Sequence, residues 1–172
     1  MQVTQRFTRL AGLAADESVK STLCFKHGAI IYKGGKKICA GYNQNTRTTY
    51  RKNICCSVHA EMDTVTKFLN SFIKIHSTKN PNKIRRKLNK FSICVVRSQE
   101  NSDGDLYYLN SMPCIDCMNK LKHVGLKNII YTGDNRTIQT ARLSKFDINE
   151  LKFCGVMKHA NVLELMRVVP LI

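Results

Sequence analysis

The sequence contains two short segments, VHAE at residues 58–61 and PCIDC at residues 113–117, that together indicate a metal site. Each segment stands at the expected start of a helix, where side chains three residues apart face the same side. A catalytic zinc ion takes three protein ligands from imidazole nitrogen and thiolate sulfur and keeps a fourth position open for water. We therefore expect His59, Cys114 and Cys117 to hold one catalytic Zn²⁺ ion.

Glu61 is not needed as a ligand, so its carboxylate is available to act on water that the metal activates. Such a carboxylate can take a proton from the water, pass it to a ring nitrogen of a substrate, and then help to protonate a departing amino group. The joint pattern, H-x-E followed by P-C-x-x-C, is the pattern of zinc-dependent hydrolytic deaminases. We expect Glu61 to be the catalytic residue of such an enzyme.

The joint pattern is more specific than its parts, because a Cys-x-x-Cys pair alone also occurs in redox proteins and in structural zinc sites. The redox interpretation is disfavoured because the proline precedes Cys114 and does not lie between the two cysteines. A structural zinc site would need a fourth ligand and would have no use for Glu61. A coincidental pattern, with His59 a hydrogen-bonded core histidine, is the weakest interpretation.

Hydrophobic periodicity along the chain predicts one α/β domain over residues 1–172. The expected elements are a helix over 3–20, a strand pair at 29–32 and 38–42 around a glycine turn, a loop over 43–53, a helix from Ser57 to about Phe72, strands over 91–96 and 106–109, a helix from Pro113 to about Val124, an antiparallel strand pair at 129–131 and 137–143, and a last helix over 161–168. We expect three α-β-α layers: a central mixed sheet of about five strands with helices on both faces.

The net charge of +16 is the strongest feature of the composition. Residues 64–99 contain nine Lys and Arg and neither Asp nor Glu, and within them segment 73–90 is predicted to be an inserted loop with at most one turn of helix at 83–89. Such an excess attracts phosphates and is typical of nucleic-acid binders, although a solvated basic surface explains it nearly as well. The candidate contacts to nucleic acid or phosphate are Arg85, Arg86 and Lys87.

No signal peptide and no apolar window of about 18 residues can be recognised, so we expect an intracellular protein, cytoplasmic or nuclear, without a membrane partner. The eight cysteines are then expected to be metal ligands or small core residues. The core group would comprise Cys24, Cys39, Cys55, Cys56 and Cys94. A second, structural zinc ion held by Cys154 and His159 together with Cys55 or Cys56 is not favoured.

With these segments in place, the sequence resembles the CMP/dCMP-type deaminases of the cytidine/deoxycytidylate deaminase-like superfamily over roughly residues 24–145. The likeness rests on residues 25–41 as the first strand pair, on Gly-Tyr-Asn at 41–43, and on the two segments quoted above. The resemblance implies the cytidine deaminase-like fold, a homo-oligomer, and substrate contacts from Ala60 and Asn43. Asn43 matches an asparagine that contacts the sugar in relatives; a simple turn asparagine is an equally open interpretation.

The sequence combines marks of two branches of that group. Histidine as the first ligand resembles the deoxycytidylate, tRNA and polynucleotide branches, whereas the antiparallel strand pair after residue 128 resembles the free-nucleoside enzymes. We expect conversion of cytosine to uracil in a free nucleotide or nucleoside, with dCMP or CMP favoured. The alternatives are a polynucleotide deaminase for cytosine or adenine in RNA, tRNA or single-stranded DNA, gripped by segment 73–90, and an inactive nucleic-acid-binding scaffold. Aromatic stacking platforms are not evident, since Phe68, Phe72, Tyr107 and Tyr108 are interpreted as core or pocket wall.

Overall fold

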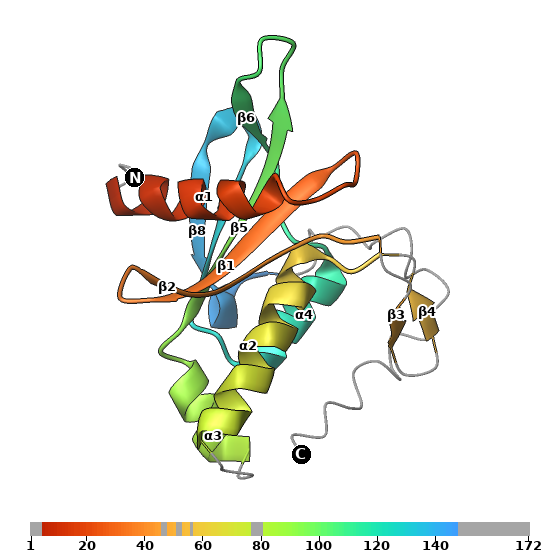
Figure 1. Ribbon diagram of the computed structural model, residues 1–172. Coiled ribbons are helices and arrows are strands. Elements are labelled where there is room, and N and C mark those ends of the chain that lie inside the picture. The colour runs from red at the N-terminus through yellow and green to blue at the C-terminus, as the bar shows by residue number, and fades with distance from the viewer. Residues whose placement is uncertain (1–4, 46–47, 51–52, 56, 77–80, 148–172) are drawn as a thin grey trace.

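The computed structural model describes residues 5–45, 48–50, 53–55, 57–76 and 81–147 (Figure 1). Its elements are α1 (Gln5–Ser18), β1 (Lys26–Lys33), β2 (Lys36–Tyr42), β3 (Thr48–Tyr50), β4 (Asn53–Cys55), α2 (Ala60–His76), α3 (Pro81–Leu88), β5 (Ser92–Glu100), β6 (Leu106–Leu109), α4 (Ile115–Val124), β7 (Asn128–Thr132) and β8 (Ile138–Arg142), with two short 3₁₀ turns at Asp134–Arg136 and Leu143–Lys145. The expected alternation of helices and strands is confirmed.

The main sheet has the strand order β2-β1-β5-β7-β8, with β6 paired to β5, so it contains six strands. Strands β5 and β7 run parallel, and the other pairs are antiparallel, which confirms a mixed sheet. The antiparallel pair β7–β8 also confirms the hairpin expected after residue 128. At one edge of the sheet, the pairing of β1 with β2 shifts register between Ile31 and Tyr32.

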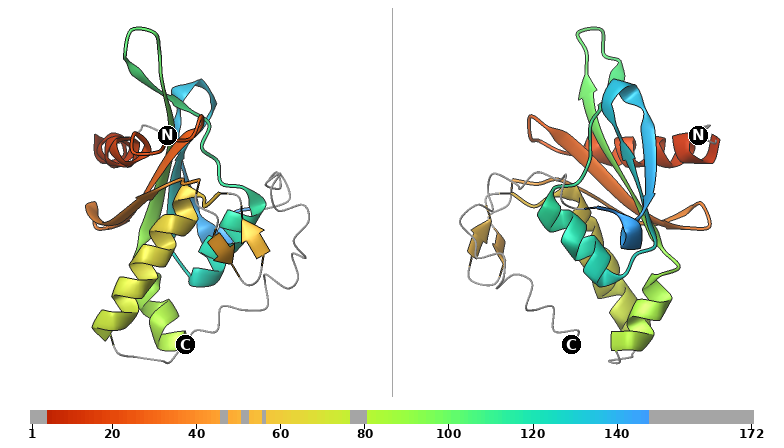
Figure 2. Two further views of the ribbon diagram at one scale, coloured as in Figure 1. Left: turned by 45° about the vertical axis from the view of Figure 1, so that its right-hand side comes forward. Right: turned by 180° about the vertical axis from the view of Figure 1, so that it is seen from behind.

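Helices cover both faces of this sheet, as expected. Alternate side chains of a strand point to opposite faces, and on β1 Ala29 and Ile31 belong to a core with α2, α3 and α4, whereas Ile30 and Tyr32 belong to a second core with α1. Figure 2 shows α1 on one side of the sheet and α2 with α4 on the other. The expected three-layer α-β-α architecture is therefore confirmed.

The aromatic residues of α2 are core residues, as the sequence indicated. The ring of Phe68 packs against those of Phe72 and Phe91, with centroid distances of 5.5 and 4.9 Å. Tyr108 packs against the core beneath α1, and Tyr107 lies half-buried with the guanidinium of Arg136 5.7 Å from its ring centre. Phe68 and Phe72 are thus buried, and Tyr107 and Tyr108 are half-buried.

The structure around the first motif differs from the prediction in three respects. The expected loop at 43–53 includes β3 and the first residue of β4, which pair in a small two-stranded sheet. Strands of three residues are too short for a periodic pattern to reveal. Helix α2 begins at Ala60 and not at Ser57, because Val58 forms a β-bridge with Gln44. Its C-terminal end lies at His76, beyond the expected Phe72.

The prediction of an inserted basic loop at 73–90 is wrong for the part of it that the structure describes. Helix α2 extends into the segment, and α3 occupies residues 81–88. Ile84 and Leu88, four residues apart, are each only 1% exposed and pack in the core. The basic residues therefore form the outer face of an amphipathic helix, and apolar burial decides the structure.

The predictions for cysteines outside the first motif have mixed outcomes. Cys94 is buried and Cys39 half-buried, as expected, whereas Cys24 is exposed because it precedes β1 and does not lie within a strand. The expected helix at 161–168, Cys154, His159, and the side chains of Cys55 and Cys56 lie outside the described residues. No helix in the described part of the chain combines the length and the apolar character that crossing a membrane requires.

Candidate metal centre

The three expected ligands meet at the N-termini of two helices. His59 directly precedes α2, and its carbonyl accepts the first hydrogen bond of that helix from the Asp63 amide (3.0 Å). Cys114 is the N-cap residue of α4, and Cys117 lies in the first turn of the same helix. Both helix dipoles therefore place their positive ends at the cluster, where they stabilise thiolates.

The distances between the ligand atoms suit a zinc ion. His59 Nδ1 lies 3.3 Å from Cys117 Sγ and 3.7 Å from Cys114 Sγ, and all three ligand atoms lie within 4.8 Å of one another. Tetrahedral zinc, with bonds of about 2.0 Å to nitrogen and about 2.3 Å to sulfur, keeps its ligands roughly 3.5–3.8 Å apart. Among the described residues, one imidazole and two sulfurs thus fit one catalytic zinc ion and supply three of its ligands.

The two sulfurs of the cluster influence each other's pKa in opposite directions. The hydrogen bond from Cys117, together with that from His59, lowers the pKa of Cys114 to about 4 against the effect of its burial. The same contact and complete burial raise the pKa of Cys117 well above its usual value. A lowered thiol pKa favours the thiolate form, which is the form that binds a metal cation.

The segment that leads into His59 is held by strand-like contacts. Val58 and Gln44 exchange two backbone hydrogen bonds of 2.9 and 3.0 Å, which attach this segment to the end of β2. The Thr64 hydroxyl bonds to the carbonyl of Ala60 at 2.7 Å, within the first turn of α2. A side chain on Gly41 would lie 2.7 Å from that hydroxyl, so β2 can approach α2 only through glycine.

A buried pair of hydroxyl groups fixes the loop that carries Cys114. The hydroxyl of Ser111 donates to the carbonyl of Val95 on β5 (2.8 Å) and accepts from the Thr132 amide on β7 (2.9 Å). The Thr132 hydroxyl in turn lies 2.8 Å from the Ser111 hydroxyl. Ser111 thereby joins two central strands three residues before the ligand. No motif in the sequence marks this role, because it depends on the parallel pairing of β5 with β7.

The carboxyl group of Glu61 lies in the first turn of α2 and is 4% exposed. Burial raises the pKa of this carboxyl above its usual value, and the nearby charge of His59 opposes the shift. A buried carboxyl two residues from a metal ligand is costly unless it has a task. Glu61 interacts electrostatically with His59 and Cys114 and therefore lies close to the ligand cluster.

The amide group of Asn43 holds the beginning of β1. Its Nδ2 donates to the Phe25 carbonyl (2.6 Å), and its Oδ1 accepts from the His27 amide (2.8 Å). Asn43 is 8% exposed, and Ala60 is fully buried. Asn43 therefore has a structural role, since its side chain binds the backbone at the start of β1. The oxygen and the nitrogen of its amide each keep one further hydrogen-bonding position for another partner.

Two residues that sequence reasoning missed lie on the same sheet face as the zinc helices. His27 on β1 pairs with Arg97 on β5, and both continue the alternation of Ala29 and Val95, which face α2 and α4. Burial, with smaller contributions from the Arg97 and His59 charges, lowers the pKa of His27 to about 4. The alternation of side-chain direction along the two neighbouring strands could have revealed from the sequence that His27 and Arg97 face this side.

The basic residues of α3 are not brought to the metal cluster. Arg85, Arg86 and Lys87 are exposed, and α3 lies near the C-terminal end of α2, whereas Glu61 lies at its N-terminal end (Figure 1). The 17 residues of α2 separate the two ends by about 25 Å. Arg85 also packs over Gly125, the left-handed cap of α4, where a methyl group would come within 2.8 Å of Arg85 Cγ.

Comparison with known proteins agrees with this geometry. Residues 1–133 match the family model of the cytidine and deoxycytidylate deaminase zinc-binding region, and the chain belongs to this family. Its fold is similar to that of a cytidine deaminase from Burkholderia pseudomallei (16% identity over 83% of this chain and 94% of that one, TM-score 0.54).

A second similar structure is the dCMP deaminase of cyanophage S-TIM5 in its apo form (19% identity over 77% of this chain and 86% of that one, TM-score 0.49). The same phage enzyme in complex with dCMP and dUMP matches with a TM-score of 0.41. No curated protein sequence matches the chain. The zinc-binding family and the His-Cys-Cys cluster together fit one catalytic zinc ion.

Proposed function

We propose that this chain is a zinc-dependent hydrolytic deaminase that converts cytosine to uracil in a free nucleotide or nucleoside, with dCMP or CMP as the favoured substrate. The observation that supports the proposal most strongly is the buried carboxyl of Glu61 beside a cluster of three metal ligands, with no fourth ligand among the described residues. A structural zinc site would need a fourth ligand and no buried carboxyl. An inactive scaffold would likewise need the ligands but not Glu61.

The chain's own residues can supply the proton transfers of such a reaction. Zinc, when bound by His59, Cys114 and Cys117, supplies an activated water nucleophile near neutral pH. Glu61 takes the proton of that water and delivers it to the ring nitrogen beside the carbon under attack. Glu61 then helps to protonate the amino group, which leaves as ammonia. Burial raises the pKa of Glu61, which suits a group that both takes and gives a proton.

The substrate contacts proposed for Asn43 and Ala60 follow from their positions. Ala60 is the first residue of α2, and the first amides of a helix have no intrahelical acceptor. With its side chain fully buried, Ala60 would contact the base through its backbone N–H. Asn43 would use the remaining hydrogen-bonding position of its amide for the sugar, while its other bonds keep β1 in place.

The position of Arg97 favours a nucleotide as the substrate over a nucleoside, which has no phosphate. Its guanidinium lies 4.4 Å from the ring centre of Phe25, an exposed aromatic residue, on the sheet face that carries the zinc helices. A cation there can bind a substrate phosphate. The matched test compares CMP with cytidine: Arg97→Gln should raise KM for CMP by about tenfold and leave KM for cytidine within about twofold. An equal effect on both substrates would contradict the phosphate contact.

The first experiment measures ammonia and uracil release by the zinc-loaded protein from cytidine, CMP, dCMP, single-stranded DNA, RNA and tRNA, with Glu61→Ala as the blank. Turnover of CMP or dCMP that requires Glu61 would support the proposal. Turnover of polymers alone, suppressed by salt and by Arg86→Ala/Lys87→Ala, would replace it with the polynucleotide alternative. Absence of turnover with zinc bound would favour the inactive scaffold.

A further inference from the structure

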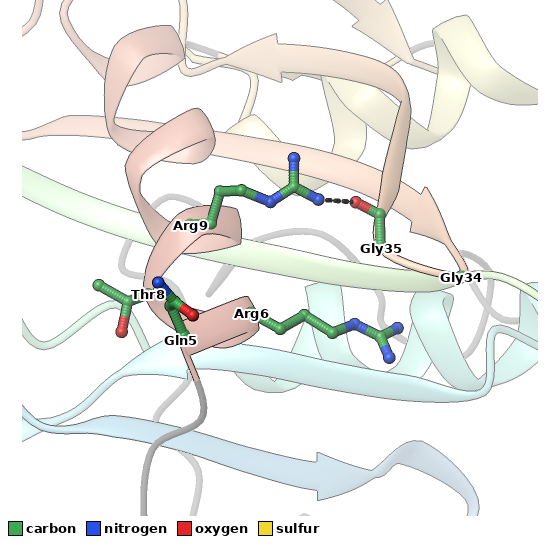
Figure 3. A pocket seen from close by; sticks show the side chains of 6 residues that line it. All are labelled: Gln5, Arg6, Thr8, Arg9, Gly34 and Gly35. Carbon is green, nitrogen blue, oxygen red and sulfur yellow. Dashed lines mark hydrogen bonds between the residues drawn. The ribbon is translucent and has the colours of Figure 1, made fainter.

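An open cavity lies on the opposite side of the sheet from the metal cluster. It has a volume of about 650 Å³ and is formed where the first turns of α1 meet the turn between β1 and β2. Its lining residues are Gln5, Arg6, Thr8, Arg9, Gly34 and Gly35 (Figure 3). The cavity has no part in the proposed deaminase reaction, because the sheet and the core beneath α1 separate it from α2 and α4.

Two guanidinium groups converge on the glycine turn of this cavity. Arg6 and Arg9 are three residues apart on α1 and therefore lie on one face of the helix, and Figure 3 shows both side chains extending toward the turn. Arg9 Nη2 donates to the carbonyl of Gly35 at 2.5 Å. A methyl group at Gly35 would lie 3.3 Å from Arg6 Nε and 3.6 Å from Arg9 Nη2, so both guanidinium groups lie close to this glycine.

The positive charge of this cavity is not neutralised by the described part of the protein. The three ion pairs found there join Glu17 to Lys20 and Lys37, and Asp63 to Lys67, and none involves Arg6 or Arg9. The exposed Lys36 follows the turn directly, whereas the Lys33 ammonium lies 5.5 Å from the ring centre of Phe91 and does not add to this charge. The hydrogen bond to Gly35 occupies one of the five N–H donors of Arg9.

We propose that this cavity binds the phosphate groups of a small polyphosphate ligand, such as the phosphate chain of a free nucleotide. Arginine is the preferred side chain for phosphate, because its planar fork donates two parallel hydrogen bonds. Two forks one helical turn apart can bind neighbouring phosphates of one chain. All six lining residues come from the first turns of α1 and from one turn, and so small a site favours a compact ligand over an extended strand.

The test measures the affinity of the full-length, zinc-loaded protein for tripolyphosphate by titration calorimetry. We expect the double variant Arg6→Gln/Arg9→Gln to bind at least about tenfold more weakly than the unmodified protein. The matched control, Arg142→Gln/Lys145→Gln, removes the same charge from exposed positions on β8 and the turn after it, and should change affinity by less than about twofold. Equal weakening in both variants, or no binding by the unmodified protein, would overturn the proposal.

A second arm distinguishes a small phosphate ligand from the backbone of a polynucleotide. A short single-stranded oligonucleotide should compete poorly with tripolyphosphate if the cavity takes a compact ligand. Stronger binding of the oligonucleotide, with a larger loss in the double variant, would overturn the proposal in favour of a polymer contact. Should the double variant fold poorly, Arg6→Lys/Arg9→Lys keeps the charge but removes both forks, and should still weaken tripolyphosphate binding severalfold.

Discussion

The two faces of the sheet place charge in opposite ways. On the face covered by α2 and α4, ionisable groups are drawn inward: Cys117 and Glu61 are 3% and 4% exposed and lie at helix N-termini. On the face covered by α1, Arg6 and Arg9 are exposed at the rim of an open cavity. The buried charged residue of α1, Glu17, is paired there with Lys20 and Lys37. A buried charged group needs a partner or a metal ion, whereas an exposed charged group is solvated and can bind a ligand from solution.

The largest effect is expected when a metal ligand is removed from the sheet face covered by α2 and α4. Cys117→Ala should abolish stoichiometric zinc binding and lower the deaminase rate by more than about 10³-fold, because the remaining pair cannot hold the metal for catalysis. Treatment of the unmodified protein with a chelator should have the same effect, reversed by added zinc. The measurements are zinc content and the rate of uracil release. Retention of full activity without metal would refute the catalytic zinc site.

The next test separates metal binding from proton transfer. Glu61→Gln preserves the size of the side chain but removes the group that exchanges protons, so kcat should fall by about 10²–10⁴-fold. Zinc content should stay at one ion per chain, because Glu61 is not a ligand. A variant that lost zinc along with activity would instead make Glu61 part of the metal cluster.

A smaller effect is expected from Ser111, which touches neither metal nor substrate. Ser111→Ala leaves the buried Thr132 amide without its hydroxyl partner, which should cost about 1–3 kcal/mol of unfolding free energy. The loop before Cys114 would loosen, and zinc affinity measured by competition with a chelator should fall by about tenfold. The matched control is Ser102→Ala in the exposed turn after β5, which should change neither quantity.

The smallest effect concerns pH and compares two histidines. The pKa of His27 is lowered to about 4 in the folded protein, below the usual 6.5. His27 therefore binds a proton more readily in the unfolded chain than in the folded protein. The free energy of unfolding is not reduced by this difference above about pH 6.5, and it decreases as the pH falls from 6.5 toward 4. His27→Gln should reduce the loss of unfolding free energy between pH 7 and 5 by roughly 1 kcal/mol. His123→Gln, at an exposed position on α4, is the control; equal slopes for the two variants would contradict the assignment.

The sequence was sufficient wherever a local pattern determined the structure. The H-x-E and P-C-x-x-C segments predicted the metal cluster, and the turns at residues 34–35 and 133–135 predicted both hairpins. Structure that depends on distant partners was missed. The role of Ser111 requires the pairing of β5 with β7, and the helix α3 is apparent only once Ile84 and Leu88 have a core to pack against. The meeting of Arg6 and Arg9 with Gly35 likewise depends on how α1 packs against the turn between β1 and β2, which the sequence does not reveal.

The register shift between Ile31 and Tyr32 has a consequence for how copies of the chain can meet. Strand β2 forms one edge of the sheet, and an exposed edge is a template for aggregation through strand addition. Here the irregular pairing coincides with exposed Lys36 and Lys37 at the start of the edge strand. Twisted and charged edges of this kind resist further pairing, so β2 is a poor seed for fibres even in a chain rich in β-structure.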